Sequence, residues 1–178
     1  QDDLDDASME SGDRSLAQMS AIAAEIRSFE GSDFDYQEAL TYDIVAWMLK
    51  RLEAGADKWR FHGYPVNQLF GIQSGFPTFM ESVHAVNDET DAANYITRLS
   101  KVKLKFEQVL AGLKHRESLS IIPPTFVVEK VLEEMRGFIG GPVEENILYA
   151  SLKTKLEEAE FSEERQAFYL GEAKVVIE

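Results

Sequence analysis

The sequence predicts an all-α protein of about six helices, bridged by one irregular segment rich in glycine and proline. Apolar residues recur at spacings of three and four in most of the chain, which is the period of an amphipathic helix. Glycine and proline fall between these stretches, where helices are expected to end. With 178 residues, of which 44% are hydrophobic, the chain is long enough to build one domain with a real core.

The charge balance restricts the partners of this segment. The chain has 18 Lys and Arg against 32 Asp and Glu, a net charge of −14. Nucleic acids and anionic membranes both attract clustered basic residues, so we expect neither as a partner. No apolar run approaches the roughly 20 residues that span a bilayer. Without cysteine, the chain has no disulfide, cysteine-type zinc site or thiol nucleophile.

The domain organisation is predicted to be simple. Residues 1–13 carry six acidic residues and no basic one, which favours a mobile acidic lead-in. Residues 14–178 are predicted to form a single helical domain. Its first helix runs from Ser15 to a stop at Gly31, with Asp13 as a possible cap. Because the sequence begins with glutamine rather than methionine, we expect a processed, cloned or trimmed start.

A second helix is expected from Tyr36 to Leu52, capped by Asp33 or Asp35. Its apolar face is wide, which predicts a central position in the fold. The residues of that face are Leu40, Ile44, Val45, Trp47, Met48, Leu49 and Leu52.

Residues 61–77 form the irregular segment. Glycine or proline interrupts it every few residues, so a regular helix cannot run far through it. It also contains many aromatic and aliphatic residues, which favours an ordered, partly buried path over a solvated linker. Pro77 is expected in the first turn of a short helix that continues to about Ala85.

The polar residues of this segment have two interpretations. Asn67, Gln68 and Gln73 lie among apolar neighbours, and buried amides need hydrogen-bond partners. They could satisfy backbone groups that the irregular path leaves free. Alternatively, together with Tyr64, they could line a cleft and contact a peptide. Both interpretations stay open at the level of sequence.

The clearest helical pattern covers residues 90–115, with Asp88 or Thr90 as its cap. Its apolar seam follows alternating steps of three and four, through Ala92, Tyr95, Leu99, Val102, Phe106, Val109 and Leu113. Such a seam fits antiparallel packing within the domain or a coiled coil with a partner.

Three more helices are predicted toward the C-terminus. The first opens at Pro124 and ends at Gly140 and Gly141. Two others meet near Phe161 and Ser162. The last one stays apolar through Ile177 with no cap, glycine or proline to end it, so we expect a truncated chain.

No catalytic or metal-binding motif is complete. Ser74 stands one place late for a G-x-S-x-G nucleophile elbow, and no strand precedes it. Glu81 and His84 form one ExxH pair, whereas di-iron bundles need two such pairs and two further glutamates. We therefore expect no catalytic, cofactor-binding or metal-binding residue in this chain, and assign His84 to an interface or a helix cap.

Four motifs resemble one known family. They are YPVNQLFGIQSGFPTF at residues 64–79, DAANYITRL at 91–99, IIPPTFVVEKVLEEMRGFI at 121–139 and ENILYASLK at 145–153. In this order they resemble the bacterial domain-of-unknown-function family 885, over most of the chain after about Phe34. Members of that family are much longer, are similar to zinc metallopeptidases with an HExxH helix in their later half, and are often lipoproteins of the cell envelope or periplasm.

The resemblance implies that this chain is the non-catalytic, N-terminal helical part of a zinc-metallopeptidase-like protein. Its partner would be its own missing C-terminal half, which would carry the zinc, and peptide would bind in a cleft walled by Tyr64, Asn67, Gln68 and Gln73. The chain itself contains no HExxH. The alternative is a free-standing helical module for protein–protein interaction, which would use the 92–113 seam or the apolar end near Val176.

Overall fold

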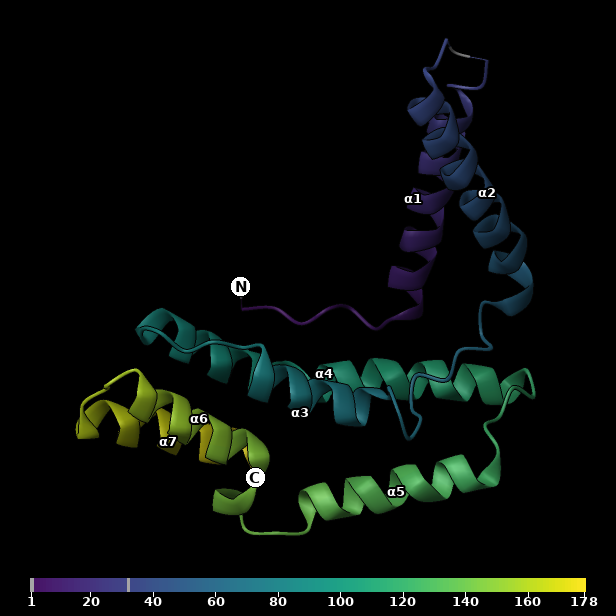
Figure 1. The fold of residues 1–178 in the computed structure, drawn as a ribbon. Helices are drawn as coiled ribbons and strands as arrows, with labels where there is room; N and C mark the ends of the chain where they lie inside the picture. The colour runs from purple at the N-terminus through teal and green to yellow at the C-terminus, as the bar shows by residue number, and fades with distance from the viewer. Residues whose placement is uncertain (1, 32) are drawn as a thin grey trace. The chain divides into compact units, whose positions relative to one another are not determined.

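The computed structural model describes residues 2–31 and 33–178, most of which lie in helices joined by irregular segments (Figure 1). The described residues form seven α-helices and one short 3-10 helix, with no strand, which confirms the predicted all-α class. The elements are α1 (Met9–Arg27), α2 (Tyr36–Trp59), α3 (Ile72–Ser82), α4 (Glu89–Ser118), α5 (Thr125–Ile139), η1 (Val143–Glu145), α6 (Ile147–Glu158) and α7 (Glu163–Ile177).

Backbone contacts divide the chain into two compact units. The main unit consists of the first six residues and Tyr64–Glu178, and the hairpin unit is Ala7–Gly63. That residues 14–178 act as a single domain stays a prediction.

The hairpin unit consists of α1 and α2. α1 begins at Met9, earlier than the expected Ser15, because the Ser8 hydroxyl accepts a hydrogen bond from the Ser11 amide and caps the helix. Asp35 caps α2 as expected, in a capping box with Glu38.

The expected central position of α2 is wrong. Among the described residues of the hairpin unit, Ala23 is the one fully buried hydrophobic residue, so the core of this unit is thin. The predicted apolar face of α2 is largely exposed, because within the unit only α1 packs against it. Its exposed large residues are Tyr36, Leu40, Ile44, Trp47, Met48, Leu52 and Trp59.

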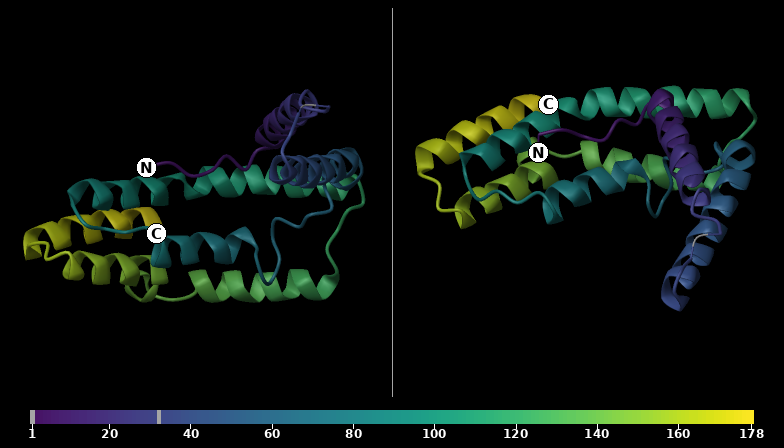
Figure 2. Two further views of the ribbon diagram at one scale, coloured as in Figure 1. Left: turned by 45° about the horizontal axis from the view of Figure 1, so that its top comes forward. Right: turned by 90° about the horizontal axis from the view of Figure 1, so that it is seen from above.

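The core of the main unit lies between α3, α4, α6 and α7, and α6 packs beside α7 in each view (Figure 2). Tyr95 of α4 is fully buried and donates its hydroxyl hydrogen to the Leu148 carbonyl, 2.9 Å away. The buried members are Phe76, Met80, Val86, Ala92, Tyr95, Leu99, Leu148, Leu152, Leu156, Tyr169 and Ala173.

The long helix α4 fits its sequence pattern well. Asp88 caps it by accepting a hydrogen bond from the Asp91 amide at 2.9 Å, as expected. Along the 92–113 seam, Tyr95 and Leu99 are buried in the core that α4 forms with α6 and α7. The seam is therefore used within the chain rather than left open for a partner.

The short helix α3 begins earlier than expected. It starts at Ile72, which places Pro77 inside the helix rather than in its first turn. The irregular path accordingly ends at Gly71, where the Pro65 carbonyl accepts from the Ile72 amide and the Gly71 carbonyl accepts from the amides of Ser74 and Gly75. Pro77 has no N–H to donate to the Gln73 carbonyl, one turn back.

None of the described helices is both long enough and apolar enough to pass through a membrane.

Candidate functional site

Asn67 organises the loop before α3. Its side-chain amide donates to the Tyr64 carbonyl at 3.0 Å, and its side-chain oxygen accepts from the amides of Leu69 and Phe70 at 3.0 and 2.8 Å. Its own carbonyl accepts from the Gly71 amide at 3.2 Å. Asn67 thus satisfies backbone groups of an irregular path, as the structural interpretation predicts.

Gln73 ties this loop to α5. Its side-chain nitrogen donates to the Asn67 carbonyl at 2.7 Å and to a carboxylate oxygen of Glu134 at 3.0 Å. The side chain is only 9% exposed, and its oxygen is buried with no partner among the described residues. An amide in this position fixes the loop against two helices.

The structure brings Tyr64, Asn67 and Gln73 together through these bonds. Gln68 is half-buried and makes no side-chain hydrogen bond to any residue that the structure describes. The amide groups of Asn67 and Gln73 are engaged inside the loop. Their use, with Tyr64 and Gln68, as a peptide-contacting cleft stays a prediction.

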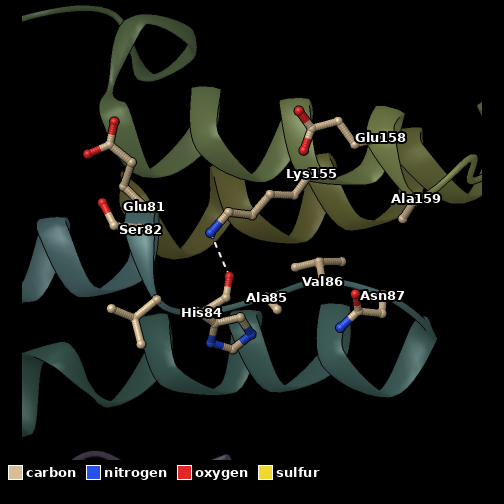
Figure 3. A pocket seen from close by; sticks show the side chains of 10 residues that line it. Glu81, Ser82, His84, Ala85, Val86, Asn87, Lys155, Glu158 and Ala159 are labelled. Atoms are coloured by element: carbon tan, nitrogen blue, oxygen red, sulfur yellow. Dashed lines mark hydrogen bonds between the residues drawn. The ribbon is translucent and has the colours of Figure 1, made fainter.

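A pocket of about 350 Å³ lies at the other end of α3 (Figure 3). The end of α3 and the segment that follows it form one wall, and α6 forms the other. Its polar lining residues are Glu81, Ser82, His84, Asn87, Lys155 and Glu158.

Lys155 reaches across this pocket from α6 (Figure 3). Its ammonium group donates to the carbonyls of Met80 and His84, both at 2.6 Å. Burial lowers the pKa of Lys155, while Glu81 and Glu158 act in the opposite direction. A cation that satisfies carbonyls at a helix C-terminus stabilises that end, so Lys155 serves as a tertiary cap for α3.

His84 lies beneath the pocket, only 5% exposed, with its ring directed toward α4. Arg98 donates to ring nitrogen Nδ1, which leaves the hydrogen on Nε2 to be donated to the Asp91 carbonyl at 3.1 Å. Burial lowers the pKa of His84, and the charges of Arg98 and Lys155 lower it further. The ring is held neutral, in one tautomer.

This arrangement decides the role of the ExxH pair. Both ring nitrogens of His84 are occupied by protein partners, so the pair with Glu81 is not a metal site. Within residues 2–31 and 33–178, no group of three or more His, Asp or Glu side chains is placed to hold a metal ion. The prediction of an interface or capping role for His84 is confirmed, because its amide donates to the Phe79 carbonyl at the end of α3 and its ring bonds to α4.

The sequence did not reveal Lys155 or Arg98 as partners of this junction. Both look like ordinary surface cations of amphipathic helices, and their partners lie 71 and 14 residues away in the chain. The ExxH spacing singles out His84 in the sequence but does not predict its partners.

The fold defines an all-helical segment, with the junction at His84 and the loop at Asn67 as its most ordered polar sites among the described residues. The chain belongs to the family described as "Bacterial protein of unknown function (DUF885)", whose model matches residues 1–175. The predicted resemblance to this family is confirmed. No curated protein matches the chain.

The fold is also similar to a solved structure, that of the putative lipoprotein from Colwellia psychrerythraea. The TM-score is 0.86 at 16% sequence identity, and the match covers 99% of this chain and 32% of that chain. At this identity the likeness establishes a shared fold. This chain spans about a third of that protein's length.

Proposed function

We propose that this chain is the non-catalytic, N-terminal helical part of a zinc-metallopeptidase-like protein of the cell envelope. In this role it packs against a zinc-bearing C-terminal part and forms one wall of a peptide cleft. Membership of the family and the match to about a third of a much longer protein support the proposal. The sequence contains no HExxH, so the zinc ligands would come from the other part.

The observation that carries the proposal is an apolar surface on α5 of the main unit. Val128, Leu132 and Ile139 are 39%, 42% and 75% exposed along one face of the helix, although Val127 and Val131 of the same helix are buried. Apolar side chains exposed together on one element mark an interaction surface. We assign this surface to contact with the C-terminal part.

The cleft wall is assigned to the loop before α3. Leu69 and Phe70 are 70% and 91% exposed at the tip of this loop, which Asn67 and Gln73 hold in place. In the proposed role Asn67 and Gln73 shape the wall. Tyr64 and Gln68, with these two apolar side chains, contact the peptide.

The test begins with the isolated chain, which should bind no stoichiometric zinc and cleave no peptide in a library. Hydrolysis that persists after trace proteases are removed would overturn the proposal.

The source DNA downstream of Glu178 should be read next, because the proposal requires an open frame that encodes an HExxH helix. In that longer protein, Leu132→Asp should weaken contact between the parts. Lys130→Asp, at an exposed position on the opposite side of the same helix, is the matched control.

A second candidate is a helical module for protein–protein interaction. The exposed apolar face of α2 favours it, since Ile44, Trp47 and Met48 stand 52–60% exposed on consecutive turns. The N-terminal part of the 92–113 seam is unsuitable for this purpose because Ala92, Tyr95 and Leu99 are buried in the core. Light scattering after size exclusion separates the candidates: a stable dimer that Ile44→Asp dissociates would favour the module.

A further inference from the structure

The acidic residues 2–6 lie along α4 within the main unit. Lys101 bonds to the Asp2 carbonyl and to the Asp3 carboxylate, both at 3.1 Å. Lys105 bonds to the Asp5 carboxylate at 2.8 Å and to the Asp5 carbonyl at 3.3 Å. We propose that this face of α4 is a docking site for an extended acidic peptide, which residues 2–6 occupy in cis.

The spacing of the cations matches an extended chain. Arg98, Lys101 and Lys105 stand at i, i+3 and i+7, on one face of the helix. The rise from Lys101 to Lys105 is about 6 Å, at 1.5 Å per residue. Two residues of extended chain, from Asp3 to Asp5, advance by about 6.6 Å. Successive cations therefore meet acidic side chains at alternate positions of the peptide.

The contacts recognise a peptide rather than negative charge alone. Each cation donates to a main-chain carbonyl, and for Arg98 this is the Asp3 carbonyl at 3.2 Å. Leu4, between the two paired aspartates, packs against the hydrophobic core of the main unit. A phosphodiester chain offers neither the carbonyls nor the aliphatic side chain. The ligand is an extended segment with acidic residues on both sides of a leucine.

The site is also preorganised. Arg98 is held from behind by ring nitrogen Nδ1 of His84, and its guanidinium stacks 5.1 Å from the centre of the Phe79 ring. Lys105 is only 8% exposed with residues 2–6 in place, and its ammonium group lies 2.8 Å from the Asp5 carboxylate. Side chains that are already ordered lose less entropy when a peptide binds.

This inference goes beyond the proposed function and concerns a different surface. The test uses the full chain and a fluorescein-labelled peptide with the sequence of residues 1–7, and measures fluorescence anisotropy at low ionic strength. In the wild-type chain the cis segment competes at a high effective concentration. The variant Asp3→Ser/Leu4→Ser/Asp5→Ser should therefore bind the peptide at least about tenfold more tightly than wild type.

The cations are tested in this background. Lys101→Glu should weaken peptide binding at least about fivefold, because it replaces two attractive contacts by a repulsion. Lys103→Glu makes the same charge change at an exposed position of the same helix and should leave the affinity within about twofold. A peptide with Asp3→Lys should bind the Lys101→Glu protein better than the native peptide does.

Three results would overturn the inference: no saturable binding up to about 1 mM peptide, equal losses from Lys101→Glu and Lys103→Glu, or equal competition by an oligonucleotide of the same charge. Circular dichroism checks the fold of each variant. If the triple variant does not fold, Asp3→Lys/Asp5→Lys replaces it, because both side chains are exposed and Leu4 is kept.

Discussion

Gly71 is the position at which a single added methyl group should do the most local damage. A Cβ atom at this residue would lie 2.0 Å from the side-chain oxygen of Gln73, and 2.5 and 2.6 Å from the backbone oxygen and nitrogen of Asn67. Two of these atoms belong to the backbone, so no side-chain rotation relieves the overlap. The φ angle of −69° is ordinary, and the requirement for glycine comes from close approach alone.

The cost of Gly71→Ala follows from what must move. Asn67 would have to separate from α3, which breaks the bond from the Gly71 amide and the bond from the Gln73 side chain to the Asn67 carbonyl. Overpacking typically costs about 1–3 kcal/mol, and each lost hydrogen bond adds about 1 kcal/mol. We expect the free energy of unfolding to fall by about 3–5 kcal/mol.

Urea denaturation followed by circular dichroism at 222 nm measures this change. Gly75→Ala is the matched control, because a Cβ there meets nothing within 4 Å and the position lies inside α3. Alanine is the better helix former, so this control should be stabilised by about 0.5–1 kcal/mol. Equal midpoints for Gly71→Ala and wild type would refute the reasoning about the loop.

Three further predictions concern the junction of α3, α4 and α6. Because the pKa of His84 is lowered and its ring is neutral in the fold, the stabilising contribution of His84 should be complete above pH about 6.5 and should decrease as the pH falls below that value. A pH series of urea denaturations should show this decrease in the free energy of unfolding, and His84→Gln should reduce it. Lys155→Met should cost about 1–3 kcal/mol, because two carbonyls at the end of α3 lose their donor; Lys153→Met, at an exposed position of α6, should change thermal stability by less than about 0.5 kcal/mol. Tyr95→Phe should cost about 1 kcal/mol by removing the buried hydrogen bond from the Tyr95 hydroxyl to the Leu148 carbonyl, and an unchanged melting temperature would contradict that role.

Local signals in the sequence predicted the helices well. Asp35 and Asp88 cap α2 and α4, because the side chain of an aspartate just before a helix can accept a hydrogen bond from the backbone amide three residues later. This geometry depends only on neighbouring residues. The seam of α4 could be predicted for the same reason, because the spacing of its apolar residues is contained in one continuous stretch of sequence. Gly140 follows α5 as a stop signal.

Long-range contacts set the limits of that approach. The start of α3 depends on how Asn67 bonds to Gly71 and Gln73, and no residue pattern fixes that bond network. The wide apolar face of α2 predicted that this helix is buried. A wide apolar face shows only that a helix can be buried on that side. Whether another element covers it is decided elsewhere in the chain, and within the hairpin unit α1 covers only part.

Arg98 joins the two sites of the main unit that the sequence did not predict. One nitrogen of its guanidinium holds the neutral ring of His84 beside the pocket, and another holds the Asp3 carbonyl of the acidic segment. A protonated His84 ring would have no acceptor at Nδ1 and would repel Arg98. The charge state of one buried ring therefore bears on the peptide-docking face of α4, through a single side chain that contacts both.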